Sequence, residues 1–349
     1  MTGNIDHELL SQLENLIAPT NEFSQPNLTA LALKLKNLDI ISLNLKFFGF
    51  ELARRLASSL PSCVGSPFKA VGLTSKACIQ ADIESDWAAH WFGQLQIPRL
   101  YHRKLWELAF CLQCLAEHDM LQPGRRGLGF GCGEEPIASY LAAHGVETTI
   151  TDLPPEDAAA SGWRDTYQHL SQASTAFRPH LVDREKFDQN VSIRFVDMNA
   201  IPADLLGYDF CWSICALEHL GTIAKGMTFV ENSLATLKPG GVAVHTTEFN
   251  FLSQDATLDN WPTVLPQRRH FEELAERLRN KGHFVAPLDF DVGVRPLDRF
   301  IDIPPYPGDP GGRLELLNGH HECAHLKLSI DGFASTCFGL VIKKAVEGS

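Results

Sequence analysis

The chain has 349 residues, of which 44% are hydrophobic and 21% are charged, and its formal net charge is −12. This length permits one large domain, or one domain with an appendage. The acidic balance argues against a broad nucleic-acid-binding surface, because contacts to phosphates need clustered Lys and Arg. No apolar run reaches the roughly 18 residues that span a bilayer, and the N-terminus lacks the pattern of a secretory signal.

The first 100 residues favour helices. Between residues 28 and 60 the apolar side chains recur at helical spacing, and Trp87 and Trp91 lie four residues apart, on one face of a further helix. The two tryptophans face the core or form an aromatic wall over a substrate. We interpret residues 1–100 as an N-terminal helical cap or extension and residues 101–349 as the main domain.

A strong helix is predicted from Tyr101 to Met120, and its entry, YHRKLWE, crowds aromatic and charged side chains together. A solvated helix start explains most such clusters. This one leads directly into a glycine-rich strand, so it is also a candidate for contact with a substrate. The candidate residues are Tyr101, His102, Arg103 and Trp106.

The stretch from Arg125 to Leu153 reads as strand, glycine turn, helix and strand. Its turn, GLGFGCG, lets a ligand approach the backbone, and free N–H groups at the start of the next helix attract negative charge. Asp152 closes the second strand, where an acidic residue can accept hydrogen bonds from a ribose. This pattern predicts a nucleoside-binding βαβ unit.

Further strands alternate with helices along the rest of the chain, as expected for a parallel sheet with right-handed crossovers. Residues 191–196 form a short strand, and 208–215 form an apolar strand of the type that is buried on both faces. The turn LKPGG leads into the strand at 242–247. In such a sheet the ligand crevice lies at the carboxyl ends of the strands.

Four elements in this order resemble the class I S-adenosylmethionine (SAM)-dependent methyltransferases: GLGFGCG, Asp152, the pair Asp197-Met198, and LKPGG. The resemblance covers roughly residues 101–349. It implies an α/β fold with a Rossmann-like, seven-stranded and mostly parallel sheet, and SAM as the cofactor. The turn departs from the family pattern, because Gly129 stands where an acidic residue is usual and Glu135 replaces the last glycine.

Carried over residue by residue, the resemblance places the glycine backbone against the methionine part of SAM, Asp152 on the ribose, and Asp197 and Met198 on the adenine. The residues expected at the cofactor are Gly129, Phe130, Gly131, Gly133, Glu135, Asp152, Leu153, Asp197, Met198 and Cys215. NAD is the competing nucleoside, but the third glycine of its G-x-G-x-x-G turn is missing here and LKPGG has no counterpart there.

Methyl transfer to a hydroxyl needs an aligned nucleophile and a base. His219 follows the 208–215 strand and is the candidate base, because imidazole titrates near neutral pH. Glu218 and Glu248 are further catalytic candidates, and Asn250 is a candidate for binding the substrate. No dedicated metal site is expected; a divalent cation held by Glu218, His219 or Glu248 is conceivable.

We expect a cytoplasmic SAM-dependent transferase that methylates a sugar hydroxyl of a glycan or glycosylated precursor. The segments YHRKLWE, VDMNAIP, CALEHLG and HTTEFN also resemble a bacterial subset of this methyltransferase family that is associated with surface-glycan biosynthesis. The alternatives are N- or O-methylation of another small metabolite, or a non-catalytic SAM-binding partner protein. The sequence leaves the oligomeric state open, and a homodimer fits it.

Overall fold

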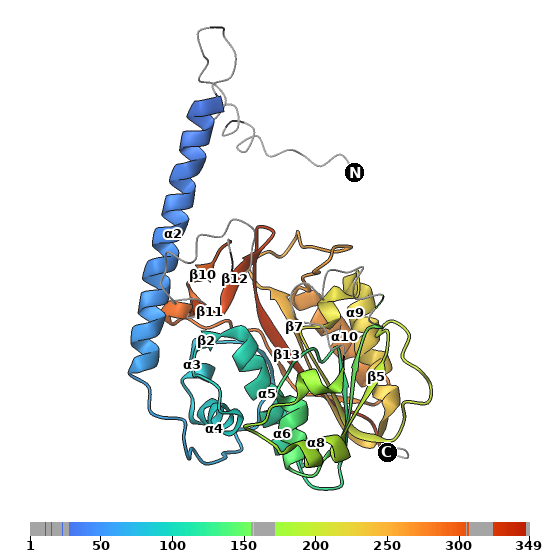
Figure 1. The fold of residues 1–349 in the computed structure, drawn as a ribbon. Helices are drawn as coiled ribbons and strands as arrows, with labels where there is room; N and C mark the ends of the chain where they lie inside the picture. The colour runs from blue at the N-terminus through green and yellow to red at the C-terminus, as the bar shows by residue number, and fades with distance from the viewer. Residues whose placement is uncertain are drawn as a thin grey trace.

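An eleven-stranded sheet lies at the centre of the part of the chain that the structure describes (Figure 1). The computed structural model describes residues 28–154, 172–304 and 324–346, and the single residues 11, 15, 23, 156 and 306. The helices are α2 (Leu28–Ser58), α3 (Gln80–Ile83), α4 (Asp86–Leu95), α5 (Arg103–Glu117), α6 (Ile137–Ala143), α8 (Arg184–Asn190), α9 (Ile223–Ser233) and α10 (Arg268–Asn280). Short 3-10 turns are η1 (Ala173–Ala176), η2 (Leu217–His219), η3 (Leu234–Thr236) and η4 (Pro296–Asp298).

The main strands are β3 (Arg126–Phe130), β4 (Glu147–Asp152), β5 (Val191–Phe195), β6 (Tyr208–Ile214), β7 (Leu237–Asn250) and β13 (Phe333–Lys343). Shorter strands join the edges: β1 (Ser75–Ala77), β8 (Phe284–Val285), β9 (Leu288–Asp289), β10 (Ile301–Asp302) and β12 (Lys327–Ile330). A separate parallel pair is formed by β2 (Tyr101–His102) and β11 (Ala324–His325).

The strands β5, β4, β3, β6 and β7 run parallel in this spatial order, and β13 pairs antiparallel with β7. The predicted fold class, α/β with a mostly parallel central sheet and an N-terminal helix, is confirmed. The short edge strands enlarge the sheet beyond the seven expected. The parallel connections bring the carboxyl ends of β3, β4, β6 and β7 to one edge, where a ligand is expected.

The core occupies both faces of the sheet. All seven residues of β6 are buried, as predicted for a strand covered on two sides. Phe210 and Trp212 pack with the helices α4, α5 and α6, whereas Cys211, between them, faces the cluster under α9 and α10. This alternation follows from the two-residue period of a strand.

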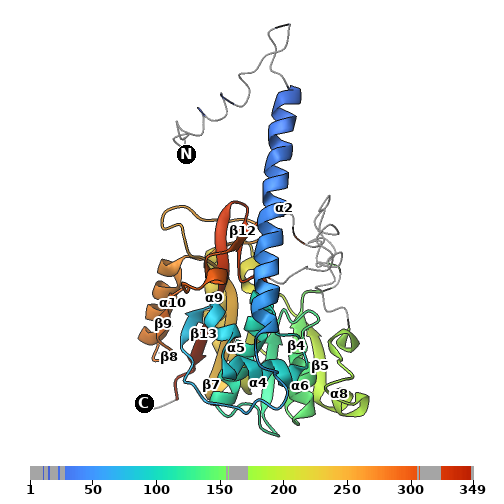
Figure 2. The same ribbon diagram turned by 90° about the vertical axis from the view of Figure 1, so that its left-hand side faces the viewer.

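The helix α2 extends well beyond the body in two perpendicular views (Figures 1 and 2). Residues 75–77 pair with β13 and β9, so part of the predicted N-terminal extension belongs to the sheet. The division at residue 100 stays a prediction. Within the described residues, none of the helices is long and apolar enough to cross a membrane.

Candidate functional site

The glycine turn after β3 is held in a conformation that disfavours side chains. Gly131 and Gly133 have φ values of +58° and +49°. A Cβ at Gly131 would lie 2.7 Å from the Cβ of Ala216 and 3.3 Å from the sulfur of Met198. The turn therefore leaves its backbone bare beside the ends of β5 and β6, as a cradle for a ligand requires.

Asp152, the last residue of β4, reaches this turn. Its Oδ2 accepts a hydrogen bond from the backbone N–H of Gly133 at 3.2 Å, and its Oδ1 accepts one from Leu153 at 2.8 Å. The glycine turn and Asp152 therefore lie next to each other, as predicted.

Asp197 and Met198 follow β5. The side chain of Asp197 is exposed, and its Oδ1 accepts from the backbone N–H of Asn199 at 2.8 Å. Met198 is buried and lies beside Gly131. Met198 is therefore placed beside the turn where the resemblance expects the adenine ring, whereas the Asp197 side chain faces solvent.

Two predicted cofactor residues need correction or refinement. The side chain of Phe130 is fully buried against Phe229, with ring centroids 5.1 Å apart, so only its backbone faces the turn. Strand alternation turns it into the core. Cys215 is buried with φ of +42°, and its thiol lies 3.4 Å from that of Cys337. Cys215 therefore lies with the buried side chains of Glu107 and Cys337.

The missing acidic residue of the turn has a structural reason. A Cβ at Gly129 would lie 2.4 Å from the ring of Trp212 and 2.3 Å from the sulfur of Cys132, so no larger residue fits. The indole N–H of Trp212 donates to the carboxylate of Glu135 at 3.4 Å. Burial raises the pKa of Glu135 well above its ordinary value, and Lys104 opposes this shift. Glu135 therefore brings a carboxylate to the altered turn.

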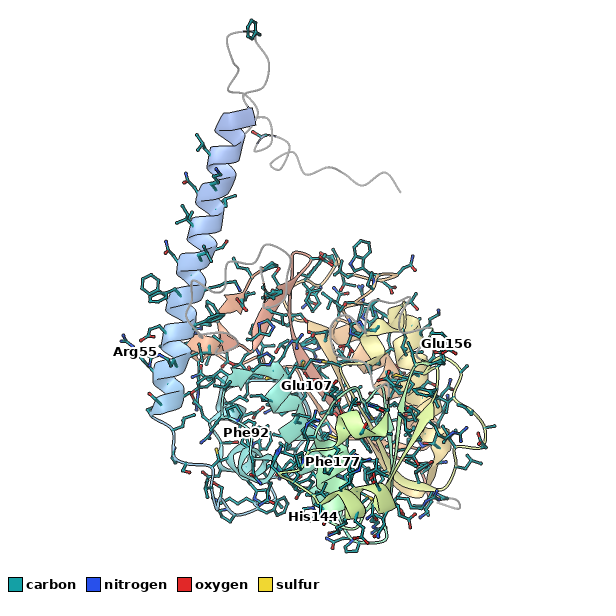
Figure 3. All side chains as sticks on the ribbon, viewed as in Figure 1. Arg55, Phe92, Glu107, His144, Glu156 and Phe177 are labelled. Atoms are coloured by element: carbon teal, nitrogen blue, oxygen red, sulfur yellow. The ribbon has the colours of Figure 1, made fainter. Side chains whose placement is uncertain are left out.

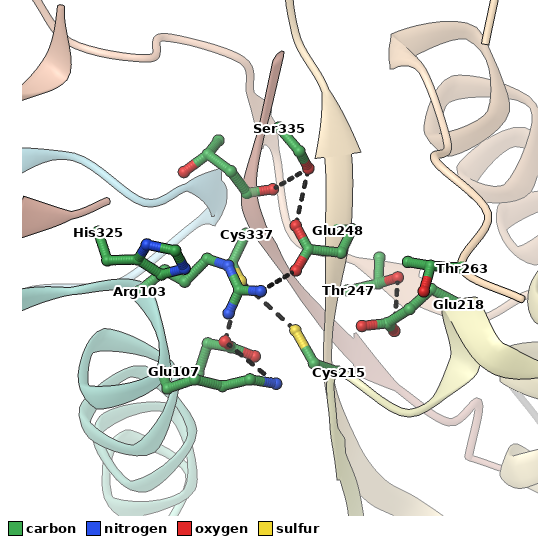
Figure 4. Close-up of polar contacts among 12 residues, drawn as sticks. Arg103, Glu107, Cys215, Glu218, Thr247, Glu248, Thr263, His325, Ser335 and Cys337 are labelled. Atoms are coloured by element: carbon green, nitrogen blue, oxygen red, sulfur yellow. Dashed lines mark hydrogen bonds and ion pairs between the residues drawn. The ribbon is translucent and has the colours of Figure 1, made fainter. Parts of the chain in front are cut away.

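On the other side of the rim, α5 supplies buried charge. Arg103 lies in its first turn, because His102 caps the helix by accepting from the N–H of Lys104. The guanidinium Nη2 of Arg103 lies 2.6 Å from Glu248 Oε1, and Ser335 donates to the other oxygen of Glu248 at 2.7 Å (Figure 4). The Nε atom of Arg103 is buried and has no hydrogen-bond partner among the described residues.

Glu107, one turn further along α5, lies inside the body (Figure 3). The hydroxyl of Thr246 and the thiol of Cys337 both donate to its carboxylate, and Lys104 Nζ lies 4.0 Å away. Burial by itself raises the pKa of Glu107, but the charges of Lys104 and Arg103 and the hydrogen bonds of the two cysteine thiols outweigh it and lower the pKa. Glu107 is therefore a fixed anion below the rim.

Glu218, in the turn η2 after β6, is 1% exposed. The hydroxyl of Thr247 donates to its Oε2 at 3.1 Å. Burial raises its pKa to about 7, Lys104 opposes the shift, and the negative charge of Glu248 adds to it. This carboxyl therefore changes protonation near neutral pH, as a general base should.

His219 points differently from its neighbour. Its Nδ1 lies 2.9 Å from the carbonyl oxygen of Pro262, so this nitrogen carries the proton of the neutral ring. Its Nε2 lies 3.9 Å from Glu218 Oε1. Burial lowers the pKa of His219 to about 4. The ring is therefore a weaker base at pH 7 than the sequence suggested.

Four predicted substrate-binding residues have partners within the protein. The fully buried Tyr101 donates to Glu84 at 2.8 Å, and the equally buried Trp106 donates to Asp82 at 2.9 Å. Both side chains brace α3 against α5, which leaves them no surface for an acceptor.

His102 and Asn250 are likewise occupied. His102 caps α5 and lies with its ring 4.9 Å from that of His325. The amide of Asn250 donates to Ala256 and Thr257 and holds the loop after β7. Of the predicted substrate-binding set, Arg103 alone among the described contacts joins the cluster with Glu218 and Glu248.

Sequence reasoning missed part of this cluster. Lys104 and Glu107 lie in the YHRKLWE segment, and their spacing of three residues placed them on one helix face. Ser335 and Cys337 come from β13, near the end of the chain, and reach the rim because β13 pairs with β7 in the register Cys337 to Glu248. No local motif announces that pairing.

Two groups of described residues have the composition and spacing to hold a metal ion: Glu107, Cys215 and Cys337, and Cys215, Glu218 and Glu248. Arg103 already neutralises Glu248 at 2.6 Å. A divalent cation bound by Glu248 would therefore have to compete with this guanidinium. A polar hollow of about 250 Å³ lies at the opposite edge, lined by Arg126, Glu147, Asp188 and Tyr208 among others.

A family model described as a methyltransferase domain matches residues 96–282, more than half of the chain. The chain belongs to this methyltransferase family. Together with the glycine cradle and Asp152, this makes the protein a SAM-dependent methyltransferase. The match begins just before β2 and ends after α10, so it includes the glycine turn, Glu218 and Glu248.

Several solved structures are similar to part of this chain at low identity. A putative sarcosine dimethylglycine methyltransferase from Galdieria sulphuraria is 16% identical with a TM-score of 0.40, and the match covers 69% of this chain and 88% of that one. The [4+2]-cyclase SpnF is 17% identical with a TM-score of 0.42, covering 69% and 83%. A Haemonchus contortus phosphoethanolamine N-methyltransferase bound to SAM is 16% identical with a TM-score of 0.40, covering 67% and 52%. No curated protein matches the sequence significantly.

Proposed function

We propose that this methyltransferase methylates a hydroxyl group, with Glu218 as the base. The proposal is carried by the position of Glu218, a buried carboxyl at the carboxyl end of β6 beside the Arg103–Glu248 ion pair. The pKa of this carboxyl is raised to about 7. A hydroxyl must lose its proton as the new bond forms, and a base is most effective when its pKa lies near the working pH.

The residues fit the expected cofactor. The bare backbone at Gly131 and Gly133 suits the methionine part of SAM, and Asp152 suits the ribose. Bound SAM supplies a methyl carbon that its sulfonium activates. Glu218 then takes the acceptor proton, the buried cluster excludes water, and Glu135 is available to hold the ammonium of the cofactor.

A sugar-like acceptor suits the polar character of the rim. Arg103 offers an unpaired buried Nε donor, and Glu248 and Thr247 add acceptor and hydroxyl groups next to Glu218. Such a set favours a polyhydroxylated ligand over an apolar one. On this proposal the acceptor is a small molecule or glycan, and the connection with surface-glycan biosynthesis remains a hypothesis from sequence resemblance.

An amine acceptor is the second candidate. Arg103 and Lys104 lie beside Glu107 and Glu248, which leaves Glu135 and Glu218 as two buried carboxyls with raised pKa values. A protonated amine beside these carboxyls would favour their ionised forms and would therefore be attracted to them. N-methylation then requires Glu218 to remove the proton from the ammonium before transfer.

The decisive experiment measures S-adenosylhomocysteine release from SAM with matched acceptor pairs, such as glucosamine, its N-acetyl form and the corresponding hydroxyl-blocked methyl ethers. We expect turnover with free hydroxyls whether or not the amine is acetylated. Turnover that disappears on acetylation would contradict O-methylation and favour the amine.

We also propose that the protein works in the cytoplasm. All cysteines among the described residues are free, and most are buried. Free thiols suit the reducing cytoplasm. Fractionation of the native host with an antibody against the protein tests this directly.

A further inference from the structure

Eight large apolar side chains are exposed on α2. Five of them recur at intervals of three and four residues: Leu38, Ile41, Leu45, Phe48 and Leu52, which are between 39% and 68% exposed. A second row, Leu33, Ile40 and Phe47, recurs every seven residues and is 43–58% exposed. Three- and four-residue spacing is the pattern of helices that pack against another helix.

The rest of α2 is fixed to the body by a different face. Lys46 is 1% exposed and pairs with the buried Asp302 at 2.5 Å, and Phe50 and Ala53 are buried beside it. At Gly49 the helix approaches so closely that a Cβ would lie 2.3 Å from the ring of Phe300. These contacts hold the helix rigidly, with both apolar rows turned away from the protein.

The two rows lie side by side on the outer surface. At 100° per residue they flank Asn37 and Asn44, which are also exposed. In a membrane these amides would lose their hydrogen bonds, whereas Asn at a helix seam pairs with its counterpart and fixes the register. The pattern therefore favours a helical protein partner over a lipid surface.

The exposed area is sufficient for a self-interface. If each half-exposed Leu, Ile or Phe contributes roughly 80 Å², the eight leave on the order of 600 Å² per chain. A symmetric pair would bury about 1,200 Å², at the lower limit of stable interfaces. Monomers seldom expose an apolar patch of this size without a function.

We propose that α2 is a self-association helix whose apolar rows pack against α2 of a second copy of this chain. A two-fold pair brings the same surface of each copy together, so a single self-complementary helix suffices. The half of α2 that stands clear of the body in Figures 1 and 2 gives the second helix room to approach. The eight exposed positions carry no charge, so the net charge of −12 is not concentrated at the contact.

The test is the mass of the full-length protein by sedimentation and light scattering between 1 and 100 µM. We expect the wild type at twice its chain mass of 38.7 kDa, or a higher even multiple. The variant Ile41→Asp with Phe48→Asp should sediment at the mass of one chain, because two charges per helix would be buried without partners.

The matched control is Leu252→Asp, which changes a leucine that is 63% exposed on the body. It should keep the wild-type mass. Far-UV circular dichroism and SAM binding show that both variants fold. A monomeric wild type over the whole concentration range would overturn the proposal, as would a double variant that keeps the wild-type mass. Binding of a monomeric wild type to neutral phosphatidylcholine vesicles would assign the rows to a membrane instead.

Discussion

The two sides of the site are built in different ways. The cofactor side uses backbone from one βαβ unit, in which Gly133 and Asp152 are 19 residues apart. The acceptor side joins α5, β6, β7 and β13, and its contact between Glu107 and Cys337 spans 230 residues. Local chain geometry therefore defines the first side, and tertiary pairing defines the second.

The two sides also differ in their electrostatics. The proposed cofactor side presents bare glycine backbone, the half-buried Asp152 and the buried carboxyl of Glu135. The acceptor side buries Arg103, Glu107, Glu218 and Glu248 together, so their charges depend strongly on one another. Substitutions should accordingly cause specific binding losses on the cofactor side, and both catalytic and stability changes on the acceptor side.

The largest effect is expected at Glu218. Glu218→Gln keeps an oxygen that accepts from Thr247 but cannot take a proton, so kcat should fall about 10²–10⁴-fold while the Kd for SAM changes little. The wild-type rate should rise as pH increases through about 7. Initial rates from pH 5 to 9 measure this, with the exposed Glu276→Gln as the control. A rate that stays constant across this range would instead assign the base to His219, whose pKa of about 4 lies below it.

Glu218→Gln should also stabilise the apoprotein. Burial raises the pKa of Glu218 from 4.5 to about 7, so the folded state binds the proton more tightly than the unfolded chain. The contribution of this carboxyl to stability is therefore largest below pH 4.5 and is lost as pH rises through about 7. At pH 8 the glutamine variant should gain on the order of 2–3 kcal/mol in denaturant unfolding. If the variant and the wild type differ in unfolding free energy by the same amount at pH 5 and at pH 8, the pKa of Glu218 is not raised.

The next largest effect should follow the loss of Arg103. Arg103→Met leaves Glu248 buried without its cation, which costs about 3–5 kcal/mol when one member of such a pair is removed. Adding Glu248→Gln to this variant should restore most of the lost stability, because no unpaired charge then remains buried. Urea unfolding of the single and double variants measures both free energies. Equal losses in the single and double variants would mean that the pair is not coupled.

Asp152→Ala should weaken SAM binding by about 1–3 kcal/mol, or roughly 5- to 150-fold in Kd, the scale for hydrogen bonds to a charged group. Calorimetric titration measures it. Asp183→Ala, which removes the cap of α8, serves as a control for nonspecific damage. Unchanged SAM affinity in Asp152→Ala would remove Asp152 from the ribose role.

A smaller effect is expected at Glu135. Glu135→Gln should weaken binding of SAM and S-adenosylhomocysteine by about 1–2 kcal/mol, because the buried Glu135 carboxyl can ionise beside an ammonium and a glutamine cannot. Binding of 5′-methylthioadenosine, which has no amino group, should not change. A parallel loss for all three ligands would show that Glu135 only supports Trp212.

The smallest effect should come from His219. His219→Gln can still donate to the Pro262 carbonyl, so turnover should fall less than about tenfold. Steady-state rates at pH 7 test this. A loss equal to that of Glu218→Gln would restore His219 as the base.

Much of the fold followed from periodicity and turn residues. The glycine turn, the fully buried β6 and the strand at 242–247 appear where they were predicted, since their signals are local. The structure extends the last strand to Leu237–Asn250, so the LKPGG segment that was predicted as a turn belongs to it. The roles of Tyr101 and Trp106 were not predictable, because an aromatic side chain in a helix entry looks the same whether it faces a ligand or Glu84 and Asp82. The proposal of Glu218 rather than His219 as the base depends on the difference between their pKa values, which burial and neighbouring charges create.

The sequence alone determined a nucleoside-binding βαβ unit in a mostly parallel sheet, because backbone freedom at glycine and the period of apolar residues act over a few positions. Only the tertiary structure decided which charges meet at the rim and which way α2 faces. Those arrangements depend on strand order and on desolvation, and both arise only when distant segments pack together.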